Sequence, residues 1–291
     1  MTSFAVTGAN GYLGSRLVQR LRADGARVVE ISRRPAPGRP DAVAYSLEEG
    51  GDLHGLSGVD VLVHAAYDFS VHTASAIRER NVEGSRRLFD AAARAGITRI
   101  VFISTMSAFA GCRSLYGLAK LQIEDDVRRR GGVVIRPGLV FGGSPLGGML
   151  GALERAVLAS RVLPVPSGGN QRLFLADEAD VADVVGRAAE QPYEATAPIV
   201  AANSMPWTLA DILRTLGQAH GRSPLVFPVP WPLVLVALKA VELTGLSLRL
   251  RSDSLVSLVN QDPSPSFAAL ERLGVVFRPF SPESVQRRPQ G

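Results

Sequence analysis

The sequence predicts an α/β protein built on a doubly wound parallel sheet, with a smaller, mostly helical lobe toward its C-terminus. Short apolar runs alternate with helical patterns through about the first 140 residues, which is typical of a parallel sheet. The run at 59–63 is nearly all apolar, as expected for a strand covered on both faces. After Gly142 the alternation stops, and helical patterns dominate from Trp207 onward.

Taken in order, the pattern predicts strands at 3–7, 27–32, 42–45, 59–63, 99–104 and 133–135. Helices are expected at 12–23, from about 72 to 94, and at 115–130; a further helix at 177–190 precedes a strand at 198–202. Gly and Pro cluster at 142–148 and 164–169, which we interpret as loops. We therefore expect one domain over 1–142, with returns at about 173–202, and a lobe over 143–172 and 203–291.

The composition is that of an ordinary globular enzyme: 46% of the 291 residues are hydrophobic and 20% are charged. The net charge of +5 comes from dispersed basic residues, so we expect no nucleic-acid partner, although the surplus suits an anionic ligand. The only cysteine, Cys112, excludes an intrachain disulfide. No signal-peptide pattern is apparent, and the most apolar stretch, 231–246, is too short to span a bilayer. We expect a cytoplasmic protein without an integral membrane segment or a metal site.

A glycine-rich turn follows the first predicted strand directly. Gly8 permits a tight turn, Gly11 lets backbone amides approach a pyrophosphate, and Gly14 lets the next helix pack against the strand. The N-terminus of that helix offers oriented N–H groups to phosphates. This placement between a strand and a helix predicts a Rossmann-like dinucleotide-binding domain.

The glycine spacing G-x-x-G-x-x-G is also where the chain begins to resemble a known family. It is similar to the extended (or atypical) short-chain dehydrogenase/reductase superfamily, in particular its NAD(P)-dependent epimerase/dehydratase family. The resemblance continues in order through His64-Ala65-Ala66, Asn81, Ser104-Thr105, Tyr116-x-x-x-Lys120 and Arg136-Pro137-Gly138, and weakens after about residue 145. It implies a cofactor site made of Gly8, Asn10, Gly11, Tyr12, Leu13, Gly14, Ser32, Arg33, Arg34, Ser46, Leu47, His64, Ala65, Ala66, Asn81, Ser104, Tyr116, Lys120 and Pro137.

Tyr116 and Lys120 are four residues apart in a helical stretch, so they share one face. A neighbouring ammonium favours the phenolate and would lower the tyrosine pKa toward a useful range. The 32 basic residues include only two lysines, Lys120 and Lys239, so a lysine at 120 indicates a need for a compact ammonium. By resemblance, Thr105 is the third catalytic residue, with Ser104 and Ser107 as rivals, and it is expected to contact substrate together with Asp68, Ser107 and Arg172.

The choice of cofactor depends on the end of the second strand. Where NAD-preferring relatives carry a carboxylate, this chain has Ser32, followed by Arg33 and Arg34. Guanidinium groups match phosphate geometry, so NADP(H) is favoured over NAD(H). Glu30 is an alternative ribose partner and argues the other way.

Three functions remain open. The favoured one is an NAD(P)-dependent oxidoreductase or epimerase of a secondary alcohol or ketone in a nucleotide sugar, with Arg172 facing the sugar diphosphate. The second is a ketoreductase of a larger apolar substrate, of the 3β-hydroxysteroid dehydrogenase or dihydroflavonol reductase kind, which the apolar 225–246 region favours. The third is a non-catalytic dinucleotide-binding protein. The resemblance also implies a homodimer through the helices at 72–94 and 115–130.

Overall fold

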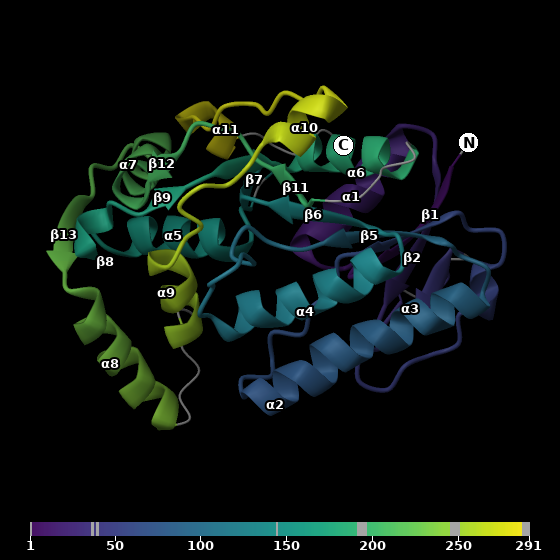
Figure 1. Ribbon diagram of the computed structural model, residues 1–291. Coiled ribbons are helices and arrows are strands. Elements are labelled where there is room, and N and C mark those ends of the chain that lie inside the picture. Colours follow the sequence, from purple (N-terminus) through teal and green to yellow (C-terminus); the bar gives the residue numbers. More distant parts are fainter. Residues whose placement is uncertain are drawn as a thin grey trace.

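The computed structural model describes residues 2–35, 38, 41–143, 145–190, 197–244 and 251–286. Within them the chain forms a seven-stranded parallel sheet of order β11-β6-β5-β4-β1-β2-β3 (Figure 1). Its strands are β1 (Ser3–Thr7), β2 (Arg27–Ser32), β3 (Ala42–Ala44), β4 (Val61–His64), β5 (Arg99–Ile103), β6 (Val133–Pro137) and β11 (Ile199–Ala201). This confirms the predicted doubly wound α/β fold.

Helices cover both faces of this sheet, which explains why its strands are nearly continuous apolar runs. Helices α1 (Tyr12–Ala23) and α6 (Glu178–Glu190) lie on one face, where Leu17 and Val184 are fully buried. Helices α3 (Gly84–Arg94) and α4 (Leu115–Arg129) lie on the other face, where Phe89 and Ile123 are buried (Figure 1). Helix α3 continues from α2 (Ala74–Ile77) through the π-helical turn η2 (Arg78–Glu83).

The strand order reverses beside β1, whose neighbours are β2 on one side and β4 on the other. At such a switch point the loops that follow the strands diverge, and open α/β sheets bind ligands there, beyond the carboxyl ends of the strands. Topology alone therefore places a binding site beside the glycine turn that follows β1.

The C-terminal part has its own core around Phe141, Leu150, Leu175 and Ile212, which are all buried. Its helices are α5 (Gly148–Ala159), α7 (Leu209–Ala219), α8 (Trp231–Leu243), α9 (Ser252–Val259), α10 (Ala268–Leu273) and α11 (Pro282–Gln286). Helix α10 instead packs on the sheet face beside α6. The predicted domain boundaries stay a prediction.

Three short strand pairs accompany these helices and were not predicted. They are β7 (Leu139–Phe141) with β10 (Leu175–Asp177), β9 (Arg172–Leu173) with β12 (Trp207–Thr208), and β8 (Val162–Pro166) with β13 (Leu225–Val229). The loop expected over 164–169 is therefore shorter than predicted, because β8 extends to Pro166. The short turn η3 (Ser167–Gly169) follows it directly. Pro164 and Pro166 donate no ladder hydrogen bond, but a strand of a two-stranded pair tolerates this because one of its edges is open.

The remaining short helix is η1 (His54–Leu56), which lies between β3 and β4. Among the described residues, no helix combines the length and the apolar character needed to cross a membrane.

Candidate active site

The turn between β1 and α1 has the geometry that its glycines predict. Gly8 adopts φ +69°, a conformation that disfavours any residue with a side chain. A Cβ on Gly14 would lie 2.1 Å from the carbonyl oxygen of Gly8, so α1 can approach the turn this closely only with glycine there. No side chain caps the N-terminus of α1, so its first N–H groups stay available for phosphate oxygens.

A cleft of about 1020 Å³ opens at this turn and runs along the carboxyl ends of the strands. It brings together residues that follow β1, β2, β4 and β5 and residues of α4, as the switch point requires. The predicted site residues that line it are Gly8, Asn10, Gly11, Tyr12, Leu13, Gly14, Ser32, Arg33, Arg34, Ser46, Leu47, Ala65, Ala66, Asp68, Ser104, Thr105, Tyr116, Lys120 and Pro137. The predicted residues His64, Asn81, Ser107 and Arg172 do not line it.

Tyr116 and Lys120 lie one turn apart on α4 and both face the cleft. The Nζ atom of Lys120 donates to the carbonyl oxygen of Ile103 at 2.8 Å and lies 5.9 Å from the ring centroid of Tyr116. The hydroxyl of Thr105 hydrogen-bonds Tyr116. The three predicted catalytic side chains therefore meet at the end of β5.

Burial shifts both pKa values of this pair in the direction that favours the neutral side chain. It raises the pKa of Tyr116 to about 12, against a lowering by the Thr105 hydrogen bond. It also lowers the pKa of Lys120 to about 7, although the Glu124 carboxylate acts in the opposite direction. The lowered tyrosine pKa expected from the sequence is therefore wrong for this structure, because burial outweighs the lowering by the Thr105 hydrogen bond.

A buried ion pair lies one turn beyond Lys120 on the same face of α4. Glu124 is fully buried and accepts two hydrogen bonds from the Arg136 guanidinium, at 2.8 and 2.7 Å. It also accepts one from the Ser104 hydroxyl at 2.5 Å. Ser104 therefore touches the cleft while its hydroxyl ties β5 to α4, so Thr105 is the hydroxyl in contact with Tyr116.

The N-terminus of α4 is held from the C-terminal part of the chain. One carboxylate oxygen of Asp253, on α9, accepts from the backbone N–H of Leu115 at 2.7 Å, and the other from that of Tyr116 at 3.1 Å. The Ser114 hydroxyl accepts from the N–H of Gly117 at 3.1 Å. All three N–H groups of the first turn of α4 are therefore paired, two of them by a residue 138 and 137 positions away.

His64 supports the cleft from behind. Its ring is fully buried, with Nδ1 2.8 Å from the Thr7 hydroxyl and Nε2 2.8 Å from the Ser85 hydroxyl. Ser85 donates its own proton to the carbonyl oxygen of Asn81 at 2.6 Å, so Nε2 of His64 must donate to Ser85 and Nδ1 must accept from Thr7. Burial lowers the pKa of His64 to about 3, in keeping with this neutral ring.

Asn81 holds the loop after β4. Its side-chain oxygen accepts from the N–H of Asp68 at 2.7 Å, and its side-chain nitrogen donates to the carbonyl oxygen of Asp68 at 3.1 Å. Burial raises the pKa of the Asp68 carboxyl, but hydrogen bonds from Ser70 and Arg80 outweigh burial and hold that pKa below its ordinary value. Asp68 is thus a fixed carboxylate at the wall of the cleft.

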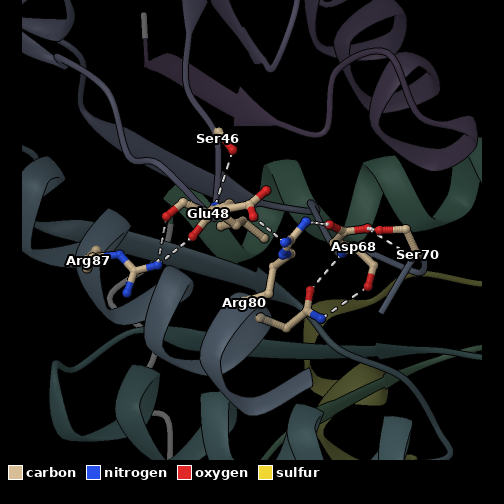
Figure 2. Close-up of polar contacts among 8 residues, drawn as sticks. Ser46, Glu48, Asp68, Ser70, Arg80 and Arg87 are labelled. Carbon is tan, nitrogen blue, oxygen red and sulfur yellow. Dashed lines mark hydrogen bonds and ion pairs between the residues drawn. The ribbon is translucent and has the colours of Figure 1, made fainter. Parts of the chain in front are cut away.

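Arg80 joins this loop to the one that follows β3. Figure 2 shows its guanidinium between Asp68, at 3.0 Å, and Glu48. Arg87, two turns later, donates to the carbonyl oxygens of Leu47 at 2.7 Å and Glu48 at 3.4 Å (Figure 2). Two arginines therefore fix the segment whose Ser46 and Leu47 line the cleft.

The part of the cleft beyond β2 carries the residues expected to select the cofactor. Ser32 ends β2, and the exposed Arg33 and Arg34 line the cleft. Asn10 donates to the carbonyl oxygen of Arg34 at 3.2 Å, which ties the glycine turn to this segment. Glu30, the rival ribose partner, is buried, accepts from Arg22 at 2.6 Å and does not line the cleft.

Sequence reasoning missed two aromatic residues beside Tyr116. The ring centroid of Tyr67 lies 5.0 Å from that of Tyr116, and that of Phe69 lies 5.6 Å from it. The Tyr67 hydroxyl is buried without a hydrogen-bond partner among the described residues, whereas Phe69 is 67% exposed. Their position directly after Ala65-Ala66, in a chain with only 6% aromatic residues, was the signal available.

Two predicted substrate residues do not line the cleft. Arg172 is exposed on β9, in register with Thr208 of β12. Ser107 donates its backbone N–H to the Thr105 hydroxyl at 3.2 Å, so it shapes the turn that presents Thr105.

Comparison with known proteins places this site in a family. The model of the NAD-dependent epimerase/dehydratase family matches residues 4–201. The chain is 29% identical to the ceramide reductase of Caulobacter vibrioides over 80% of this chain and 75% of that protein. It is 23% identical to the UDP-glucose 4-epimerase of Vibrio cholerae over 78% of this chain and 79% of that protein.

Among solved structures, the fold resembles that of MoeE5 in complex with UDP-glucose and NAD. The TM-score is 0.74 at 19% identity, over 98% of this chain and 96% of that one. The family match extends from β1 to β11 and so includes the glycine turn, the end of β5 and the Tyr116–Lys120 pair. The chain therefore belongs to the NAD-dependent epimerase/dehydratase family, whose enzymes form part of the extended short-chain dehydrogenase/reductase superfamily.

Proposed function

We propose that this chain is an NADP(H)-dependent reductase or dehydrogenase that acts at a ketone or secondary-alcohol carbon of an apolar substrate. The observation that carries the proposal is the meeting of Tyr116, Lys120 and Thr105 in the cleft that begins at the glycine turn. A phenol, an ammonium and a hydroxyl beside a dinucleotide site suit proton exchange with a substrate oxygen.

The residues present fit a dinucleotide. A Cβ on Gly14 would fill the space where α1 meets the turn, and the uncapped N-terminus of α1 faces the cleft. Arg33 and Arg34 would hold a 2′-phosphate, because the nearby carboxylate of Glu30 is engaged by Arg22 and lies outside the cleft. When bound, the cofactor would supply or accept the hydride.

Tyr116 would handle the proton. With a pKa raised to about 12 it is a protonated phenol near neutral pH, which is the form that donates to a carbonyl oxygen during reduction. Thr105 would hydrogen-bond the same substrate oxygen, since its hydroxyl already contacts Tyr116. Lys120 is partly charged near neutral pH and would stabilise the phenolate left behind.

Two observations favour an apolar substrate over the nucleotide sugar that the sequence favoured. The rings of Tyr67 and Phe69 lie beside Tyr116 and line the cleft, so the part of the substrate nearest the chemistry would meet aromatic surface. Arg172, the residue expected to face a sugar diphosphate, lies outside the cleft lining. The similarity to a ceramide reductase supports the same class.

A nucleotide-sugar epimerase is the second candidate. It is supported by the similarity to the UDP-glucose 4-epimerase of Vibrio cholerae over most of both chains. In that case the fixed carboxylate of Asp68 and the Tyr67 hydroxyl, which has no hydrogen-bond partner within the described ranges, would bind sugar hydroxyls.

A substrate panel separates these candidates. NADPH is mixed with long-chain keto lipids, steroid ketones or UDP-sugars, and the loss of reduced cofactor is followed by absorbance, with product analysis for epimers. We expect turnover with apolar ketones, and a loss of it in Phe69→Ala but not in Met205→Ala, an exposed apolar control that is 70% exposed. Turnover confined to UDP-sugars would reject the apolar class, and no turnover with either would reject the reductase.

A further inference from the structure

Helix α8 is apolar on every side, yet none of its described side chains is buried. Its only charged residues are Lys239 and Glu242. Leu233 is 64% exposed and Val236 is 66% exposed. A helix without a polar face normally lies in a protein core or in lipid, so α8 has a surface that water does not suit.

The apolar surface continues onto the strand pair that precedes α8. Leu225 and Phe227 are two residues apart in β13, so they share one face of the strand, and both are exposed. Val162 of β8 is in register with Leu225 and is exposed as well. The α8–β13 surface is defined here by Val162, Leu225, Phe227, Trp231, Leu233 and Val236. Figure 1 shows α8 following β13 at the periphery of the molecule, beside α9.

The exposed charges beside this surface are positive, whereas the nearby acid is engaged within the protein. Lys239 on α8 and Arg161 beside Val162 are exposed. Glu242, the only acid of α8, instead faces α9, where its oxygens accept from the backbone N–H of Ser252 at 2.8 Å and its hydroxyl at 2.7 Å. Arg251 lies 4.0 Å from the same carboxylate. The surface therefore combines apolar side chains with outward-facing cations, on a chain of net charge +5.

We propose that the α8–β13 surface docks onto an anionic phospholipid bilayer and lies in its headgroup region. A 13-residue helix is about 20 Å long, too short for a hydrocarbon core of about 30 Å, so α8 would lie along the interface. A bilayer suits this combination, because its acyl chains take up the exposed apolar side chains and its anionic headgroups attract the neighbouring cations. Trp231 and Phe227 suit the boundary between headgroups and chains, and the two cations suit anionic headgroups.

The test uses the full-length protein and vesicles of phosphatidylcholine, with or without an equal amount of phosphatidylglycerol. The Leu233→Gln/Val236→Gln variant removes apolar contact at exposed positions, and Val276→Gln is the matched control because Val276 is 88% exposed elsewhere. The chain has only two tryptophans, so Trp207→Phe leaves Trp231 as the only fluorescent reporter of insertion.

We expect the wild type and Val276→Gln to sediment with the anionic vesicles, and the Trp231 emission to shift to the blue. The double variant should bind those vesicles about a hundredfold more weakly while keeping its cofactor affinity. The proposal would be overturned if the double variant bound anionic vesicles as tightly as the wild type, or if the wild type did not bind them. So would a wild-type dimer that the double variant converts to a monomer, because a second copy would then cover the surface. Neither readout depends on which substrate is turned over.

Discussion

The carboxylate of Asp253 offers a measurable link between the C-terminal part of the chain and the tyrosine of the cleft. It accepts from the N–H groups of Leu115 and Tyr116 at 2.7 and 3.1 Å, at the helix end where negative charge is favoured. Asp253→Ala leaves both N–H groups without that partner. Loss of such a cap costs about 1 kcal/mol, and loss of its charge at the helix N-terminus up to about 1 kcal/mol more.

A total loss of about 2 kcal/mol should lower the Tm by about 3 °C in a chain of 291 residues. Because one of the two bonds holds Tyr116 itself, kcat should also fall, by about tenfold, with less change in KM. Asp253→Asn keeps one acceptor oxygen and should lie between the wild type and Asp253→Ala in both measurements. Thermal unfolding and steady-state kinetics on the same preparations test this.

Thr208→Ala is the matched control. The Thr208 hydroxyl caps α7 by accepting from the N–H of Asp211 at 3.1 Å, and Thr208 does not line the cleft. This variant should lose a similar cap energy, about 1 kcal/mol, and leave kcat unchanged. If Asp253→Ala unfolded at the wild-type Tm, or if Thr208→Ala reduced kcat equally, the positioning role of Asp253 would be refuted.

Three further predictions follow from buried or exposed groups of the same site. His64 has a pKa of about 3 in the fold against 6.5 ordinarily, so the unfolded chain takes up the proton first. The free energy of unfolding should fall by about 1.4 kcal/mol per pH unit below about pH 6.5. In His64→Gln, the free energy of unfolding measured with urea at each pH should depend clearly less steeply on pH. The Arg33→Ala/Arg34→Ala variant should bind NADP about a hundredfold more weakly by calorimetry and bind NAD as before; equal losses for both would count against the 2′-phosphate argument. Gly14→Ala should abolish binding of either cofactor, because its Cβ would meet the Gly8 carbonyl oxygen at 2.1 Å.

The parallel sheet was predictable because its strands carry local signals. An apolar run covered on both faces identifies β4, and a glycine turn between a strand and a helix identifies the start of α1. Strand ends differed from the prediction by one or two residues, as at β4 and β6. The pair of β8 and β13 was missed because it joins Val162 to Leu225, far apart in sequence, through segments rich in proline.

The candidate site was also only partly predictable from the sequence. Tyr116 and Lys120 share a helix face by spacing alone, and the structure brings both to the cleft. No sequence pattern indicates the role of Asp253, because its contacts with α4 are set by the tertiary packing of α9. The pKa of Tyr116 also depends on burial, which spacing does not report, so the predicted direction of its shift was wrong.

The most direct measurement is the turnover of Tyr116→Phe beside its cofactor affinity. Removing the phenol oxygen keeps the ring that contacts Tyr67 and Phe69, so NADPH should bind as it does to the wild type. The rate of NADPH oxidation with an accepted ketone should fall by about a thousandfold. A variant that turns over within tenfold of the wild-type rate, at unchanged affinity, would show that Tyr116 does not handle the proton.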